Sequence, residues 1–478
     1  MKVNLNNRFS INFAKKVLIS NRTLRDFTFK QYEKTLYNAV VGDETFPLCS
    51  KKVKMVKYYG GLALANSLLR NYDDKCISPK TANTLIDTVL QAAISPGNKR
   101  AKIKEEYKKK HGIEPPFLIT ISPTNKCNLY CKGCYASSKA ASTETLDWTT
   151  LDKIVQEAHD EMGMRFFTIS GGEPFMYQSE GKTILDLCKK WKDCFFMMYT
   201  NGTMIDEKMA KAIAEVGNLT PSISVEGFEE QTDDRRGTGT YRKILKAMEN
   251  LRKEGVIFGA SATATKNNAD VLLNDSFYSY YFEKMRVTYM WIFQYMPIGR
   301  NFTTELMLTP KQRFDLFKKW REVLKEKRWF VVDFWNSGII PNGCLSAGKQ
   351  GGYFYIDWNG NIMPCVFVPY YKDNAKELFG QGKKIQDALF SDFFCKIRGW
   401  QNSYFDNNGK QGNMLTPCII RDHHQDFLKI AREECQVIPE DIAAAEAMND
   451  PAYHKTLIEF DEKLKAVEEP CWTCDYLE

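Results

Sequence analysis

Three cysteines in one short loop are suited to hold a metal centre. The stretch "PTNKCNLYCKGCYASS" places Cys127, Cys131 and Cys134 within eight residues. A structural zinc site takes four ligands and usually needs a second ligand pair nearby. No further cysteine or histidine lies close on either side of this loop. Three thiolates on a cube of four irons would leave one iron open for a substrate or cofactor, so an iron–sulfur cluster is favoured over zinc.

A second, more dispersed group of cysteines lies in the last third of the chain. The segment "CLSAGKQGGYFYIDWNGNIMPC" begins at Cys344 and ends at Cys365, and further cysteines follow at positions 395, 418, 435, 471 and 474. Within it, "DWNGN" between two apolar runs predicts a hairpin turn. Cysteines and glycines scattered in this way are typical of a small domain whose core is partly replaced by a metal centre. The cysteines that stand singly are interpreted as packing residues: Cys49, Cys76, Cys188 and Cys194.

Short apolar runs that alternate with helical stretches must position the first loop. Six such strand–helix units follow residue 113, with apolar runs at 117–122, 166–170, 194–202, 220–227, 256–265 and 287–299. Continuous apolar strands covered by helices are typical of a parallel sheet. Six units predict an α/β fold with a partial (β/α)6 barrel, TIM-like but not closed, over residues 113–335. A small domain would follow over 336–478.

Composition limits the classes of partner. The 478 residues are 44% hydrophobic and 26% charged, which is ordinary for a soluble globular protein. The formal net charge of +7 does not require a nucleic-acid partner. No run of about twenty apolar residues predicts a membrane-spanning helix. The first twenty residues lack the apolar core of a signal peptide, so a cytoplasmic location is predicted.

Residues 1–112 are predicted to form a helical N-terminal region. Apolar residues recur there at spacings of three and four. The region ends in the basic run "NKRAKIKEEYKKKHG". This run is interpreted either as a solvated helix face or as a patch that contacts lipid headgroups at a membrane surface.

Two motifs at consecutive strand ends carry a family resemblance. The spacing Cys127-x-x-x-Cys131-x-x-Cys134 and the later "GGEP", residues 171–174, resemble signatures of the radical S-adenosylmethionine (radical SAM) superfamily. The resemblance implies a [4Fe–4S] cluster on the three cysteines, which would be catalytic. S-adenosylmethionine would bind the fourth iron and, after reduction, yield a 5′-deoxyadenosyl radical. Anaerobic handling and an electron donor such as ferredoxin or flavodoxin are also implied.

The resemblance assigns further residues to the cofactor. Those implied to surround S-adenosylmethionine are Gly171, Gly172, Glu173, Pro174, Thr200, Asn201, Ser224, Glu226, Arg236, Thr263 and Met296. Glu173 would accept the cofactor ammonium, and Arg236 would pair with its carboxylate. One position departs from the pattern: relatives commonly carry an aromatic residue before the third cysteine, against the adenine. Here that residue is Gly133, and Tyr135 follows the cysteine.

The C-terminal cysteines resemble a truncated SPASM domain, the auxiliary-cluster extension of many radical SAM enzymes. Cys344, Gly360 and Cys365 match its start, whereas the later dense run of cysteines is missing. One auxiliary [4Fe–4S] cluster is therefore expected. Its implied ligands are Cys344, Cys365 and Cys418, with Cys474 as the fourth and Cys471 or Cys435 as alternatives. His423 and His424 are interpreted either as additional ligands or as polar surface.

The expected function is radical chemistry on a peptide or protein. Relatives with this extension often modify such substrates, and the auxiliary cluster can accept an electron or bind substrate. Two alternatives stay open at this stage. One is a radical SAM enzyme that acts on a lipid or isoprenoid, and the other is a non-catalytic iron–sulfur protein for redox sensing or electron transfer.

Overall fold

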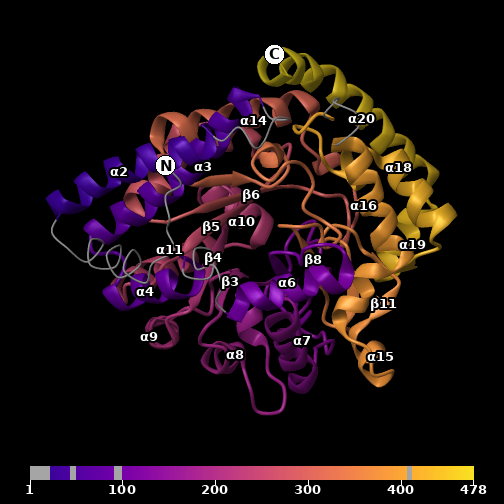
Figure 1. The fold of residues 1–478 in the computed structure, drawn as a ribbon, viewed down its shortest axis with the longest axis horizontal. Coiled ribbons are helices and arrows are strands. Elements are labelled where there is room, and N and C mark those ends of the chain that lie inside the picture. Colours follow the sequence, from indigo (N-terminus) through magenta and orange to yellow (C-terminus); the bar gives the residue numbers. More distant parts are fainter. Residues whose placement is uncertain (1–21, 43–49, 91–98, 406–411, 478) are drawn as a thin grey trace.

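The computed structural model describes residues 22–42, 50–90, 99–405 and 412–477. The N-terminal twenty residues and Cys49 lie outside these ranges. One open sheet of ten strands forms the centre of the molecule, in the order β11-β9-β8-β1-β2-β3-β4-β5-β6-β7 (Figure 1). Its strands are β1 (Leu118–Ile121), β2 (Phe166–Ile169), β3 (Phe195–Thr200), β4 (Leu219–Val225), β5 (Gly259–Ala264), β6 (Met290–Gln294), β7 (Val331–Asp333), β8 (Tyr353–Ile356), β9 (Asn361–Met363) and β11 (Asp373–Asn374). β10 (Tyr370–Tyr371) and β12 (Ile438–Pro439) pair separately.

The parallel part of the sheet confirms the predicted partial barrel. β1 to β7 pair in sequence order and all in parallel, and β7 lies at one edge of the sheet, so the barrel does not close. The six predicted strands are β1 to β6. The connecting helices are α7 (Trp148–Glu161), α8 (Ile184–Lys190), α9 (Glu207–Val216), α10 (Glu229–Arg236), α11 (Thr240–Lys253), α12 (Ala269–Leu272), α13 (Asp275–Ser279) and α14 (Pro310–Glu322), with short turns η2 (Pro174–Met176), η3 (Tyr280–Lys284), η4 (Thr304–Leu306) and η5 (Val323–Lys327).

Local sequence explains where these helices begin and end. The carboxylate of Asp147 accepts the Thr150 N–H at 2.7 Å and so begins α7. Asp206 begins α9 in the same way, through the N–H of Met209. α9 ends at Gly217, whose φ of 77° is the left-handed conformation that favours glycine. These capping residues fix the length of each connection and hence the place of each strand end.

The strand β8 joins the barrel sheet from the C-terminal part of the chain. It pairs in parallel with β1, with Tyr353 opposite Leu118, and it forms the predicted hairpin with β9. All four residues of β8 are buried, which is typical of a strand covered on both faces. The sheet therefore continues past the domain boundary expected at residue 336.

The N-terminal region is helical where it is described. It contains α2 (Arg22–Val40), α3 (Lys51–Asp73), α4 (Pro79–Leu85), η1 (Ile86–Leu90) and α6 (Lys99–His111). α3 is fixed to the barrel because the Asn71 amide donates to the carbonyl of Arg286 at 2.8 Å and the Ser67 hydroxyl accepts the Phe330 N–H at 3.1 Å. In the basic helix α6, Tyr107 is buried while most lysines are exposed, as a solvated helix face requires. No helix within the described ranges is both long and apolar enough to cross a membrane.

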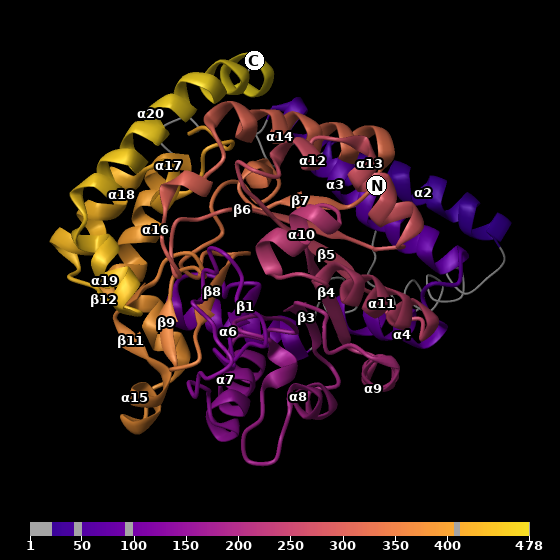
Figure 2. The same ribbon diagram turned by 180° about the vertical axis from the view of Figure 1, so that it is seen from behind.

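The C-terminal helices cover one side of the barrel (Figures 1 and 2). They are η6 (Asn336–Ile339), α15 (Ala375–Gly380), η7 (Ile385–Phe390), α16 (Asp392–Phe405), α17 (Ile419–Asp422), α18 (His424–Leu428), η8 (Lys429–Glu434), α19 (Ile442–Asn449), α20 (Pro451–Trp472) and η9 (Thr473–Leu477). α20 runs along the outer edge of the molecule and packs against α14. Glu468 of α20 faces Arg313 of α14, with 3.7 Å between carboxylate oxygen and Nε, and both side chains are fully buried.

Burial of Glu468 predicts a pH dependence of stability. Desolvation raises the pKa of its carboxyl to about 8, against the opposing effect of Arg313. The unfolded chain releases this proton near pH ~4.3. Between these values the folded state holds the additional proton, so the free energy of unfolding falls as pH rises and levels off above pH 8.

The Glu468→Gln variant is expected to remove this part of the pH dependence. Its unfolding free energy, measured by urea denaturation from pH 5 to 9, should lose a slope of up to about 1.4 kcal/mol per pH unit. Glu462→Gln on the exposed face of the same helix is the matched control and should keep the wild-type slope. Equal slopes in wild type and Glu468→Gln would contradict the assignment.

Candidate functional site

The three cysteines of the first loop line one cavity of about 250 Å³. The parallel strands that form its walls bring their carboxyl-terminal residues to one mouth, as expected for this type of sheet. Eight of the predicted cofactor residues line the same cavity: Gly171, Gly172, Thr200, Asn201, Ser224, Arg236, Thr263 and Met296. Three do not, namely Glu173, Pro174 and Glu226.

The structure explains why glycine occupies position 133. Gly133 has a φ of 60°, and a Cβ built there would lie 2.5 Å from the ring of Tyr295. Tyr295 follows β6 and itself lines the cavity, so an aromatic ring from the sheet fills the space beside the loop. The other side of the loop is fixed by Arg300, which donates to the Cys131 carbonyl at 2.8 Å and stacks over Tyr130. Neither Tyr295 nor Arg300 was found from the sequence.

Gly172 allows the second motif to approach the cysteine loop. A Cβ at this position would lie 2.3 Å from the carbonyl oxygen of Lys126 and 2.7 Å from that of Asn125. Its N–H donates to the Thr124 carbonyl at 2.9 Å. Since the nearest atoms belong to the backbone, a side chain here would displace the segment that leads into Cys127.

Alanine at Gly172 is therefore expected to weaken S-adenosylmethionine binding. Overpacking of this kind costs about 1–3 kcal/mol, which corresponds to a rise in Kd of roughly 5- to 150-fold. Equilibrium dialysis with labelled cofactor measures the change. Gly399→Ala in α16, where a Cβ meets nothing within 4 Å, is the matched control and should leave Kd unaltered. An unaltered Kd in Gly172→Ala would show that the loop tolerates the shift.

Glu173 is turned away from the cavity and joins two strand ends. Its side chain has no exposed surface, and its carboxylate accepts the Thr200 hydroxyl at 2.8 Å and the N–H groups of Asn201 at 2.8 Å and Phe175 at 3.1 Å. Burial raises the pKa of this carboxyl, while these donors oppose the shift. Glu173 thus holds Thr200 and Asn201 at the mouth and does not itself line the cavity, whereas direct contact with the cofactor ammonium was expected.

Glu226 positions two arginines beside the cysteine loop. Its fully buried carboxylate accepts from Arg236 at 2.5 Å and from Arg235 at 2.6 Å. Arg236 Nη1 lies 4.0 Å from the Cys131 sulfur, and Arg235 also reaches the carbonyl of Gly133 at 3.4 Å. Both guanidinium groups line the cavity and bring positive charge to the thiols. Arg236 and Glu226 were predicted from the sequence, whereas Arg235, the neighbour of Arg236 in the same motif, was not.

The C-terminal cysteines form a second triad at a separate cavity. Cys344, Cys365 and Cys418 all line a space of about 360 Å³. The Tyr353 hydroxyl lies 2.8 Å from the Cys365 sulfur, and the Ser346 hydroxyl lies 3.2 Å from that of Cys344. The structure therefore brings these three predicted ligands to one cavity.

The other residues considered for this site lie elsewhere. Cys474 is exposed in η9, Cys471 contacts Asp475, and Cys435 is buried near Lys372; none of them lines the second cavity. His423 Nε2 donates to the Thr416 carbonyl at 3.0 Å, and His424 Nε2 lies 2.9 Å from His454 Nδ1. His424 is buried and His423 is half-buried, and neither of them lines this cavity.

The thiols of both triads are suited to bind a cation. Burial raises the pKa of Cys127 to about 12 and that of Cys365 to about 12. Thiolates in such surroundings need positive charge, which a metal centre supplies, and a coordinated thiol loses its proton. The residues present in each triad therefore fit an iron–sulfur cluster.

A third group of metal-type ligands is already neutralised. The ligand atoms of His159, Asp193 and Cys194 lie within 4.8 Å of one another, at the opposite ends of the strands. Arg165 Nε lies 3.0 Å from the Asp193 carboxylate, and His159 Nε2 lies 2.8 Å from it. A guanidinium in this position takes the place that a metal ion would need.

The comparison with known families decides the identity of the barrel. The model of the radical SAM superfamily matches residues 121–270, which include both sequence motifs and β2 to β5. Residues 121–270 are a radical SAM domain. The protein therefore contains a radical SAM domain, and the proteins of this superfamily use S-adenosylmethionine and a [4Fe–4S] cluster.

Individual relatives extend this similarity over different parts of the chain. The Fe-coproporphyrin III synthase of Methanosarcina barkeri is 33% identical over 152 residues, which cover 32% of this chain and only 38% of that protein. Mycofactocin maturase MftC of Mycolicibacterium smegmatis is 26% identical over 63% of this chain and 77% of its own length. Among solved structures, Streptococcus suis SuiB bound to the precursor peptide SuiA has the same fold, with a TM-score of 0.53 and 17% identity over 72% of this chain and 80% of SuiB.

Proposed function

We propose that this radical SAM enzyme modifies a peptide or protein. Cys127, Cys131 and Cys134 would hold the cluster that binds S-adenosylmethionine, and the second triad would hold one auxiliary cluster of a SPASM-like domain. When bound and reduced, the first cluster and S-adenosylmethionine supply a 5′-deoxyadenosyl radical that removes a hydrogen atom from the substrate. A cytoplasmic location and electron delivery by ferredoxin or flavodoxin belong to the same proposal.

The arrangement of the two cavities carries this proposal. Five residues line both of them: Trp291, Phe334, Leu345, Tyr353 and Phe367. A single layer of mostly aromatic side chains thus separates the two cysteine triads. A substrate group at this layer would be near both metal centres, while the rings exclude water from a reactive intermediate. A second redox centre there can remove the electron that remains on a substrate radical.

The residues of the first cavity have distinct tasks in this proposal. Arg235 and Arg236, held by Glu226, would neutralise the cofactor carboxylate and the thiolate-bound cluster. Thr200 and Asn201, held by Glu173, would face the polar part of the cofactor. The aromatic rings of Phe293 and Phe334, which line the same cavity, would contact the substrate.

The relatives favour a peptide over the other substrates considered. MftC is named a maturase and SuiB was solved with a precursor peptide, and these two similarities cover 63% and 72% of this chain. The similarity to the porphyrin enzyme covers 32%. The lipid alternative and the non-catalytic iron–sulfur alternative gain no support from these comparisons.

Two assays test the proposed function. Anaerobically purified enzyme with dithionite and S-adenosylmethionine should form 5′-deoxyadenosine; none at an intact cluster would overturn the radical reaction. The enzyme should also be coexpressed with short open reading frames adjacent to its gene. Mass spectrometry should then show peptides that have lost hydrogen, and unmodified peptides beside active enzyme would overturn the peptide assignment.

A further inference from the structure

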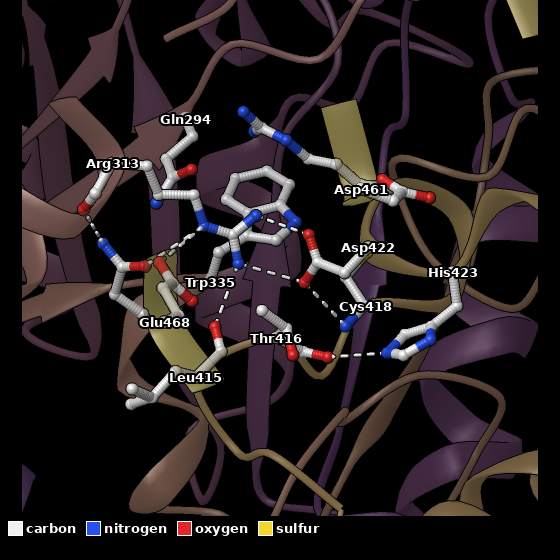
Figure 3. A network of polar contacts seen from close by, with 12 residues as sticks. Gln294, Arg313, Trp335, Leu415, Thr416, Cys418, Asp422, His423, Asp461 and Glu468 are labelled. Atoms are coloured by element: carbon white, nitrogen blue, oxygen red, sulfur yellow. Dashed lines mark hydrogen bonds and ion pairs between the residues drawn. The ribbon is translucent and has the colours of Figure 1, made fainter. Parts of the chain in front are cut away.

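A fully buried arginine in the C-terminal part has no carboxylate partner. Arg421 of α17 has no exposed surface, and its Nη1 donates to the Tyr295 carbonyl at 3.3 Å. Among the described residues, no hydrogen-bond acceptor lies at its Nε or at its Nη2. The neighbouring carboxylate of Asp422 pairs instead with Arg313 (Figure 3). A charge that is buried without a partner destabilises a fold, so Arg421 is expected to serve a purpose other than packing.

The acidic groups near Arg421 do not neutralise its guanidinium. Asp461 and Glu468 interact with it electrostatically, but burial raises the pKa of each carboxyl to about 8, so both are largely protonated at neutral pH. Asp333 interacts with it as well, although this carboxylate accepts hydrogen bonds from other groups. Arg421 itself stays charged, because burial and the neighbouring Arg313 lower its pKa only to about 10.

Arg421 lies between the two cavities. Its guanidinium carbon is 5.5 Å from the centre of the Trp335 ring, which lines the second cavity. Tyr295, whose carbonyl accepts its N–H, lines the first cavity. Cys418 of the second triad directly precedes α17, the short helix that carries Arg421, and its thiol interacts with the guanidinium electrostatically. The positive charge is therefore close to the second triad and behind the wall of the first cavity.

A cation in this place favours the reduced state of a metal centre. Four irons and four sulfides on three thiolates have a net negative charge when oxidised, and reduction makes that charge more negative. A fixed positive charge stabilises the more negative state more strongly, above all in an interior that excludes water. No lysine, arginine or histidine is among the described residues that line the second cavity itself. The charge of Arg421, behind the cavity wall, is therefore well suited to set the potential of a cluster there.

We propose that Arg421 raises the reduction potential of the auxiliary cluster and so makes this cluster a better electron acceptor for a substrate radical formed in the first cavity. This inference rests on the proposed function, in which the second triad holds that cluster. In the reaction, the substrate radical loses one electron to the iron core and one proton to solvent, and no bond to the protein forms. Arg421 acts through its charge on the cluster and is thus a positioning residue.

The test uses the full chain with Cys127, Cys131 and Cys134 all replaced by alanine, which leaves the second triad as the cluster site. The midpoint potential of the cluster is measured by anaerobic titration with dithionite and electron paramagnetic resonance. Arg421→Met in this background should shift the potential to a more negative value, because the cation is lost. Arg421→Lys keeps the charge and should stay close to the background value. Equal potentials in all three proteins, each with about four irons per chain, would overturn the proposal.

Two further measurements separate the charge from a structural role. Because an unpaired buried charge destabilises the fold, iron-free Arg421→Met should resist urea at least as well as the iron-free background, and a marked loss of stability would overturn the proposal. Arg321→Met removes a partly exposed cation of α14, which water screens, and should keep the background potential. An equal shift in Arg321→Met would show a nonspecific effect of net charge and would also overturn it. A background protein without iron would instead overturn the auxiliary cluster of the proposed function itself.

Discussion

Alanine at Cys131 is expected to abolish formation of 5′-deoxyadenosine. Cys131 lines the first cavity and lies beside Arg236, so its loss removes one of three ligands from the proposed cluster. The remaining thiols cannot retain the iron that must bind S-adenosylmethionine. The rate should fall at least about a thousandfold, or about 4 kcal/mol in activation free energy. Iron content should fall by about four atoms per chain while the second cluster stays.

The same substitution at Cys188 is the matched control. Cys188 is as buried as a ligand cysteine but packs in the barrel core and lines neither cavity. Cys188→Ala should keep the full iron content and the product yield, with a loss in unfolding free energy of about 1 kcal/mol from the removed sulfur. Product formation by Cys131→Ala, or iron loss in Cys188→Ala, would contradict the distinction between ligand and packing cysteines.

Local sequence patterns are sufficient to predict the strands but not all their partners. The apolar runs and capped helices predict β1 to β6 because each unit is encoded within a short segment. The pairing of β8 with β1 joins Tyr353 to Leu118, and no pattern near either residue indicates it. An apolar run such as "YFYI" fits a separate domain equally well, and only the packing of the whole chain decides.

The sequence likewise predicts only part of the candidate site: it indicates which residues gather at the mouth, but not the direction in which each side chain points. Strand ends predict which residues gather at the mouth, and Gly172, Asn201 and Ser224 indeed line the cavity. The direction of a side chain depends on its partners, and these lie on other strands. Glu173 and Glu226 therefore turn inward to hold cavity residues. Spacing alone likewise cannot distinguish Cys418, which joins the second triad, from Cys474, which does not.

Methionine at Arg313 of the barrel helix α14 is expected to destabilise the fold strongly. Arg313 is fully buried and pairs with Asp422, while its Nη2 also donates to the Leu415 carbonyl at 3.0 Å (Figure 3). Its removal leaves a buried carboxylate without its cation, which costs about 3–5 kcal/mol. Urea denaturation measures the loss. Arg321→Met on the same helix is the matched control, because its partly exposed pair with Asp475 should contribute about 0–1 kcal/mol.

A double variant separates stability from the positioning of the second triad. Adding Asp422→Leu to Arg313→Met removes the unpaired charge, so part of the lost unfolding free energy should return. The Cys418 N–H nevertheless loses its acceptor, and the loop that carries this cysteine loses its link to the barrel. We therefore expect recovered stability together with a lower iron content or a shifted potential of the second cluster. A double variant that recovers both would show that the ion pair serves stability alone, because the cysteine loop would then be positioned without it.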